Sequence, residues 1–423
     1  MRSPDRKIGL VEKTTRWISA IALLAVASLP EQQKPIFKSL GLDMPGSADL
    51  ISEPPPLDGD IEKNWQVREL KIKEAWELIQ SVIGDRKIVP ANIAFIDSGY
   101  SAAAMPEDLR EIPITNTLLL NHPPEEYYDH GLAMAALSVG AVWDNEAGID
   151  PICAAELCNF LIENAASGET YDNPTGFFVF NYSDLVAALN WLTTLTDENG
   201  EPQISVINMS WGGWSDVTSL RKAVELAHEK GILLVAGTGN EGEENRCFFP
   251  AKYPDVISVR AVLHLEGDPA NWGKDLAIAS FSNSCDDKKG VAAPGSLINA
   301  PQTNAEGVTT LEWIAGTSPA TAEVTGMLGM LITFLQTMGI DKIEAGLSAE
   351  EALLASATIP IYVEETQIVK WGLGMPDQEK AVAYLMKKYG YTVPIPTFEI
   401  FLPQISLENN YVLYLPMIKS ALT

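Results

Sequence analysis

The stretch ISVINMSWGGWSDVTSLRKAVELAHEKGILLVAGTGNEG, residues 204–242, decides the fold class. It begins and ends with a short apolar run closed by a glycine-rich turn, and between them apolar residues recur at helical spacing up to Gly231. A strand, a helix and a second strand in this order are typical of a parallel sheet, and the alternation continues on both sides of the stretch. We therefore expect an α/β protein with a doubly wound, mostly parallel sheet and helices on both faces.

Three segments outside this stretch carry candidate functional residues. IAFIDSG (residues 93–99) predicts a buried strand that closes in a turn, and DHGLAMAALSVG (residues 129–140) predicts a small buried helix. AGTSPATAEVTGMLGML (residues 315–331) predicts an interior helix with Ser318 as its N-cap and Pro319 at its first position. A further helix is expected to begin with Ser183 as its cap.

The charge of the chain limits its partners. The 423 residues carry a formal net charge of −27, and 46% of them are hydrophobic. Such acidity excludes nucleic acid and anionic membranes as partners, because both need clustered Lys and Arg, and it favours solubility. The composition allows a large core, and we expect a monomer.

The N-terminus indicates export. Its first sixteen residues hold five basic and two acidic side chains, and an apolar run of thirteen residues follows, too short to span a bilayer. We expect a secreted or cell-envelope protein, with the cytoplasm as the alternative. The expected organisation is a signal peptide (1–29), a linker or short pro-segment (30–60), one compact domain (61–388) and a C-terminal extension with short β segments (389–423).

Four cysteines are too few for a disulfide scaffold in a chain of this length. If the protein is exported, Cys153–Cys158 and Cys247–Cys285 can form disulfides. Buried free thiols are an equally good interpretation.

Several polar residues follow predicted strands or begin predicted helices. In doubly wound sheets, sites lie beyond the carboxyl ends of the strands, so Asp97, residues 210–213 and residues 237–240 should meet in one crevice. Ser318 is either a structural cap or a nucleophile, and His130 is a structural histidine or a general base. The chain order Asp97, His130, Ser318 is that of a subtilisin-type catalytic triad.

Five segments in this order resemble the motifs of the subtilisin-like serine proteases, the subtilases. IAFIDSG resembles the Asp motif, DHGLAMAA the His motif, VINMSWGG the substrate-binding strand, AGTGNEG the oxyanion turn and AGTSPATAEVTG the Ser motif. The resemblance runs from about Trp65 to Leu385 and implies a subtilisin-like fold, with residues 61–388 as the catalytic domain. It also implies a serine endopeptidase that acts on polypeptide substrates.

The resemblance also implies a role for each residue. Ser318 would attack the peptide carbonyl, His130 would take its proton, and Asp97 would orient the imidazole. Asn240 would donate its amide hydrogen to the oxyanion. Two backbone segments would bind the substrate. One consists of Ser210, Trp211 and Gly212, and the other of Gly237, Thr238 and Gly239.

The side chains near these segments predict which substrate side chain the enzyme prefers immediately before the scissile bond. Trp211 would make one wall bulky and apolar, and Glu241, Glu243 and Glu244 would either add negative charge at the rim or form a solvated loop. We therefore expect apolar or basic substrate side chains at this position.

The sequence departs from the subtilase motifs at Leu132, Ala133, Pro319 and Ala322, which keeps two alternatives open. One is a catalytically inactive subtilase-like binding protein, and the other is a transpeptidase that transfers the acyl group to an amine. A carboxyl esterase is disfavoured because no GxSxG motif surrounds Ser318. The chemistry requires no cofactor. Calcium is an option without assigned ligands, and the segment at 144–148 is its one candidate loop.

Overall fold

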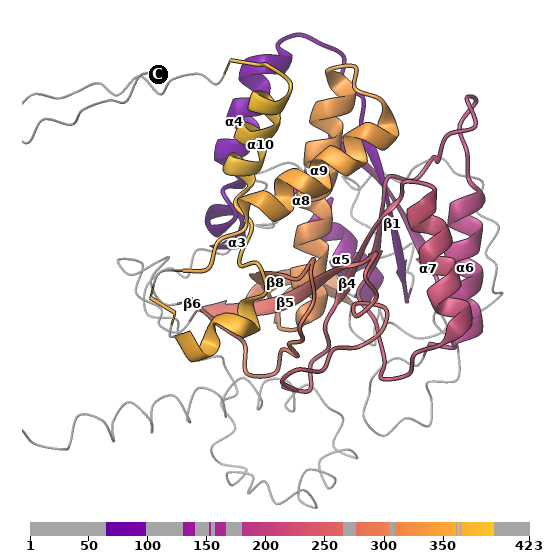
Figure 1. Ribbon diagram of the computed structural model, residues 1–423, viewed down its shortest axis with the longest axis vertical. Coiled ribbons are helices and arrows are strands. Elements are labelled where there is room, and N and C mark those ends of the chain that lie inside the picture. Colours follow the sequence, from indigo (N-terminus) through magenta and orange to yellow (C-terminus); the bar gives the residue numbers. More distant parts are fainter. Residues whose placement is uncertain are drawn as a thin grey trace, which may run out of the picture.

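A seven-stranded sheet forms the centre of the protein (Figure 1). The computed structural model describes residues 65–98, 130–139, 152–153, 157–165, 180–264, 276–303, 309–360, 362–363 and 365–392. The strand order is β2-β1-β3-β4-β5-β6, and β7 also pairs with β5. All pairs are parallel except β5–β6, so the expected doubly wound, mostly parallel sheet is confirmed. The strands are β1 (Ala91–Asp97), β2 (Cys158–Asn164), β3 (Val206–Met209), β4 (Leu233–Gly237), β5 (Ile257–His264), β6 (Leu276–Ile278) and β7 (Val291–Pro294).

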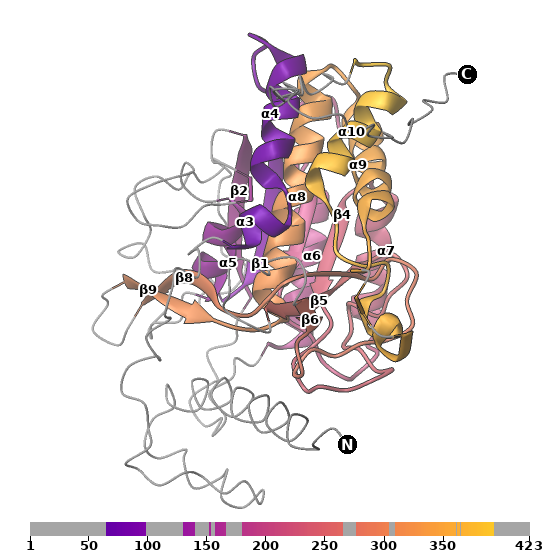
Figure 2. The same cartoon turned by 90° about the vertical axis from the view of Figure 1, so that its left-hand side faces the viewer.

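Helices cover both faces of this sheet (Figures 1 and 2). The sequence of β1 is almost continuously apolar because both faces of the strand are buried. Ile93 and Phe95 lie in one hydrophobic core, whereas Ala94 and Ile96 lie in the other. α6 (Tyr182–Thr194) and α7 (Thr218–Glu229) pack in the second core. The first core is built with α3 (Trp65–Glu69), α4 (Ile72–Ile83), α5 (His130–Ser138), α8 (Thr317–Thr337), α9 (Lys342–Ser356) and α10 (Gln378–Lys388).

The interior position expected for α8 is confirmed. The helix packs against β1, β3, β4 and β5 and against α5 and α9. Its glycines allow this close approach: a Cβ on Gly326 would lie 2.7 Å from Ile152 Cβ, and one on Gly329 would lie 2.6 Å from Ile93 Cδ1. Ala322, one of the departures from the subtilase motif, is fully buried without interrupting the helix.

Two helices begin earlier than the sequence predicted. α8 starts at Thr317 with Gly316 as its N-cap, so Ser318 lies in the first turn and is not the cap. α6 starts at Tyr182 with Asn181 in the cap position, not Ser183. Gly316 has no side chain, and the side chain of Asn181 makes no hydrogen bond to its helix. The start of α8 is instead fixed from another part of the chain, because Thr317 N–H donates to Asn240 Oδ1.

Some elements were not expected from the sequence. β8 (Ile298–Thr303) and β9 (Thr309–Ile314) form a separate antiparallel hairpin, and a 3₁₀ helix spans Glu365–Trp371. The start of the predicted C-terminal extension packs on the protein, since Tyr389 and Tyr391 contact the first core.

The predictions for residues 1–29, 30–60 and 144–148, and for most of the extension, fall outside the described residues. No helix within the described ranges combines the length and the apolar composition that a membrane span requires.

Candidate active site

A buried Asp97 pairs with a partly exposed His130. Asp97 is the last residue of β1 and is 0% exposed, and His130 is the first residue of α5. Asp97 Oδ1 lies 2.7 Å from His130 Nδ1 and also accepts a 2.7 Å hydrogen bond from the backbone N–H of Ser98. With Nδ1–H donating to this carboxylate, the imidazole keeps Nε2 as its basic atom.

The carboxylate also controls the basicity of the ring. Burial by itself would lower the pKa of His130, but the charge of Asp97 and the hydrogen bond to it outweigh that effect. The pKa is therefore raised above its ordinary value of 6.5. A more basic imidazole suits the removal of a hydroxyl proton.

Ser318 lies in the first turn of α8, next to the end of β3. Its Oγ donates a 3.2 Å hydrogen bond to the backbone carbonyl of Ser210, the first residue after β3. Ser210 is held in turn, because its Oγ donates to Asn208 Oδ1 at 2.9 Å. The N–H groups in the first turn of a helix lack intrahelical acceptors and carry the positive end of the helix dipole, so negative charge beside Ser318 is favoured.

Asn240 reaches the same helix start from the turn that follows β4. Its Oδ1 accepts from the backbone N–H of Thr317 at 2.8 Å and from Thr317 Oγ1 at 3.0 Å. Asn240 is solvent-exposed despite these two bonds. Because Oδ1 is occupied by Thr317, the residue before Ser318, the remaining hydrogen-bonding group of the side chain is its Nδ2 amide, a donor.

Asn283 is a residue that the sequence analysis missed. It is fully buried, and it holds the Asn240 turn through its amide group. Asn283 Oδ1 accepts from the N–H groups of Glu241 and Glu243, and Nδ2 donates to Thr238 O and to Glu241 Oε2. The signal in the sequence was a lone Asn in ASFSNS, with nothing to show that it contacts a turn about forty residues earlier.

The predicted substrate-binding segments lie at adjacent strand ends. Ser210 follows β3 and Gly237 ends β4, and these strands pair through Met209 and Ala236. A Cβ on Gly237 would lie 2.9 Å from Thr317 Oγ1, so this backbone also packs on the start of α8. Asp97, residues 210–213 and residues 237–240 therefore follow neighbouring parallel strands at one edge of the sheet. That they meet in one crevice stays a prediction.

The expected bulky wall from Trp211 is not present. Its ring is buried in the second core, and its indole N–H donates to Ile96 O at 2.8 Å. Of the nearby acidic residues, Glu241 accepts a hydrogen bond from Asn283 and Glu244 pairs with Lys370 at 2.6 Å. These two carboxylates thus have partners within the protein, which weakens the predicted preference for basic substrates.

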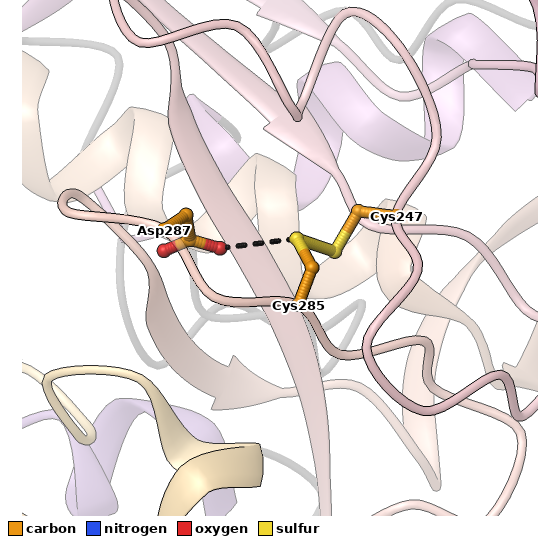
Figure 3. Close-up of side chains that lie close together, drawn as sticks. All are labelled: Cys247, Cys285 and Asp287. Atoms are coloured by element: carbon orange, nitrogen blue, oxygen red, sulfur yellow. Dashed lines mark hydrogen bonds between the residues drawn. A yellow bond between two sulfur atoms is a disulfide. The ribbon is translucent and has the colours of Figure 1, made fainter.

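Both cysteine pairs considered from the sequence are disulfides, Cys153–Cys158 and Cys247–Cys285. In the described part of the chain, the one cluster of three or more metal-ligand side chains is Cys247, Cys285 and Asp287 (Figure 3). Its two sulfur atoms are bonded to each other, so neither is a thiolate that could bind a metal. Asp287 Oδ2 instead forms an ion pair with the fully buried Arg260 at 2.8 Å.

Comparison with known proteins gives the family. The family model described as the subtilase family matches residues 121–390, more than half of the chain. The chain belongs to the subtilase family. As a subtilase it has the α/β fold of that family, in agreement with the sheet described above.

Curated relatives match parts of this subtilase. Subtilisin DY from Bacillus licheniformis is 34% identical over 172 residues, which cover 40% of this chain and 54% of that protein. The major intracellular serine protease of Bacillus subtilis (strain 168) is 28% identical over 247 residues, covering 57% and 66%. The chain thus spans about half to two thirds of the length of these relatives.

Solved structures agree over more of the chain. The prenylagaramide maturation protease PagA is 25% identical with a TM-score of 0.53, covering 76% of this chain and 99% of that one. A variant of the protease domain of PatA is 21% identical with a TM-score of 0.53, covering 73% and 98%, and this likeness supports the fold alone.

Proposed function

We propose that this subtilase is a serine endopeptidase with Asp97, His130 and Ser318 as its catalytic triad. The observation that carries the proposal is the 2.7 Å contact between the buried Asp97 carboxylate and His130 Nδ1, at the sheet edge where α8 begins with Ser318 in its first turn. A buried acid, a base with a raised pKa and a hydroxyl at a helix start are the three parts that this chemistry needs.

In the proposed reaction, the Ser318 hydroxyl breaks its hydrogen bond to the backbone carbonyl of Ser210, and its oxygen attacks the substrate carbonyl carbon. His130 Nε2 takes the hydroxyl proton and passes it to the leaving amine, and Asp97 stabilises the imidazolium. The tetrahedral oxyanion accepts hydrogen bonds from Asn240 Nδ2 and from the backbone N–H of Ser318. Water then attacks the acyl-enzyme with His130 as the base. No step uses a cofactor, and added chelator should leave the acylation of Ser318 unchanged.

The two alternatives from the sequence are outcomes of the same experiment. An inactive binding protein forms no acyl-enzyme. A transpeptidase forms it but transfers the acyl group to an amine in preference to water. PagA is described as a maturation protease. The product analysis should therefore also look for peptide products other than simple hydrolysates.

The test labels the full chain with a fluorophosphonate probe and locates the adduct by peptide mass spectrometry. We expect an adduct on Ser318. The adduct should be absent in Ser318→Ala, and the rate of labelling should be much lower in His130→Ala. Ser215→Ala changes an exposed serine after β3 and serves as the matched control, which should label like wild type. Folded wild-type protein that gives no adduct on Ser318 would contradict the proposal. Peptide products in the presence of an added amine then separate hydrolysis from acyl transfer.

We also propose that the protein is exported. The two disulfides support this, because such bonds persist in oxidising compartments and are rare in the cytosol. Relatives include both an extracellular and an intracellular protease, so the family does not decide the compartment. Fractionation of the native host should place the protein outside the cytoplasmic membrane. Reduced cysteines in protein taken directly from cells would contradict export.

A further inference from the structure

A short segment, residues 247–249, connects the two predicted substrate-binding segments through backbone hydrogen bonds. The backbone N–H of Phe248 donates to Thr238 O at 3.0 Å, which joins it to the segment after β4. Phe249 exchanges two backbone hydrogen bonds with Gly213, of 2.9 and 3.0 Å, which join it to the segment after β3. Residues 247–249 therefore form a floor that is tied to both sides, and Cys247 fixes this floor through its disulfide to Cys285.

The side chain of Phe248 lies between the two segments. A Cβ added to Gly212 would lie 2.8 Å from Phe248 Cβ, and a Cβ added to Gly239 would lie 2.9 Å from Phe248 Cδ2. A side chain at either position would collide with Phe248, and one at Gly239 would also meet Asn283 Nδ2 and Glu241 Oε2. Phe248 is only half-buried, so the ring borders the open side of the site.

Two neighbouring side chains hold the ring in place. Trp214 packs edge-on against Phe248 with ring centroids 4.4 Å apart, and the guanidinium of Arg246 lies 3.8 Å from the centroid of the Trp214 ring. Edge-to-face aromatic pairs and cation–π contacts each add to the stability of such a stack. Because the Phe248 ring packs against Trp214 and also lies against the backbone of Gly212 and Gly239, we expect it to keep its position when a substrate binds.

The position of the ring has a consequence for the substrate. We infer that, with the attacked carbonyl carbon at Ser318 Oγ and its oxygen toward Asn240, the side chain of that substrate residue extends toward the space between Gly212 and Gly239, and that Phe248 fills this space. The enzyme then cleaves after residues with small side chains, Gly, Ala and Ser, and rejects large apolar and basic ones. This inference rests on the proposed endopeptidase function and replaces the broader expectation from the sequence.

The test uses peptides that differ only in the residue before the scissile bond, with kcat/KM measured for Ala, Leu, Phe and Lys at that position. For the wild-type protein we expect Ala to exceed Phe at least tenfold, since misfit in an apolar pocket changes kcat/KM by about 10–200-fold per methylene-sized change. Phe248→Leu and Phe248→Ala form a series of decreasing side-chain volume. Along this series kcat/KM for the Phe peptide should rise at least tenfold while that for the Ala peptide stays within about threefold.

The matched control is Tyr384→Ala, which removes an aromatic ring from α10 instead of the floor. It should leave the ranking of peptides unchanged. A wild-type preference for Phe or Lys, or a ranking that does not change in either Phe248 variant, overturns the inference. Fluorophosphonate labelling of Ser318 separates this failure from that of the proposed function: labelling with the wrong ranking overturns the inference alone, whereas no labelling and no cleavage of any peptide overturns both.

Discussion

At the scale of single residues, the Asp97–His130 pair sets the pH dependence of the proposed activity. His130 must be neutral to act as a base, so kcat/KM should rise with pH through a pKa that Asp97 holds above 6.5. Asp97→Asn removes the charge that raises this pKa and leaves the burial that lowers it. We predict that the rising limb of the pH–rate profile moves to lower pH and that kcat falls by about 10⁴-fold.

The same pair affects stability with a defined sign. Because the folded pKa of His130 lies above its unfolded value, the pair stabilises the fold fully below about pH 6.5 and loses this contribution as pH rises through the folded pKa. Urea unfolding of wild type and Asp97→Asn at several pH values measures it. A pH–rate profile whose limb stays in place in Asp97→Asn would contradict the assignment of His130 as the base.

Glu323 is a second titratable residue with an unusual environment. It lies on α8, is fully buried, and neither carboxyl oxygen has a hydrogen-bond partner in the described part of the chain. Burial raises its pKa well above the ordinary value of 4.5. Its contribution to stability is therefore present below pH 4.5 and is lost as pH rises, at up to about 1.4 kcal/mol per pH unit until the folded pKa is reached.

We predict that Glu323→Gln removes this loss. The free energy of unfolding of the variant, relative to wild type, should increase steadily between pH 5 and pH 7, as measured by urea titration. Glu225→Gln, at an exposed position on α7, is the matched control and should show no such trend. A constant difference between Glu323→Gln and wild type across this range would mean that the carboxyl of Glu323 ionises in the folded protein as it does in the unfolded one.

At the scale of elements, the turn after β4 depends on a partner that is distant in sequence. Asn283 makes four hydrogen bonds to this turn, and the turn presents Asn240 to the start of α8. We predict that Asn283→Ala lowers kcat by about tenfold or more with a smaller change in KM, because it acts by positioning Asn240, whose donor acts in the transition state. It should also cost about 1–3 kcal/mol in stability.

A double-mutant cycle with Asn240→Ala distinguishes positioning from general destabilisation. If Asn283 acts through Asn240, Asn283→Ala should lower kcat little further once the Asn240 amide is gone. The stability loss should persist in both backgrounds. Effects on kcat that multiply in the double variant would contradict a positioning role, since two independent residues would then act on the rate separately.

The elements show how far the sequence predicts this protein. Apolar runs and helical spacing predicted β1, β3, β4 and α7, and their polar ends predicted the strand-end location of the candidate site. Contacts that depend on three-dimensional packing were not predictable from local pattern. The Trp211 ring was assigned to the site although a backbone carbonyl at the end of β1 holds it in the core, and the positions of Phe248 and Asn283 depend on hydrogen bonds and contacts between distant loops.

At the scale of the whole molecule, α8 lies where the sheet, α5 and α9 meet. The sequence predicted that this helix is interior, since its apolar residues recur at helical spacing and Gly326 and Gly329 let a neighbour pack closely. It did not predict the hairpin β8–β9 or the antiparallel strand β6, whose pairing partners cannot be assigned from strand propensity alone. Nor did it decide between thiols and disulfides, because four sparse cysteines carry no information on the distances between them.

The tight packing around α8 leads to a prediction that opposes helix propensity. In an isolated helix, Gly→Ala gains about 1 kcal/mol. At Gly326, however, a Cβ would lie 2.7 Å from both Ile152 Cβ and the backbone carbonyl of Ser138, so α5 would have to shift. We predict that Gly326→Ala lowers the free energy of unfolding by about 1–3 kcal/mol.

Gly346→Ala on α9 is the matched control, because a Cβ there meets only the Gly231 carbonyl oxygen, at 3.5 Å. It should raise stability by about 0.5–1 kcal/mol. Urea unfolding of both variants measures the two effects, and a stabilised Gly326→Ala would show that α8 does not pack against α5 as closely as these contacts require.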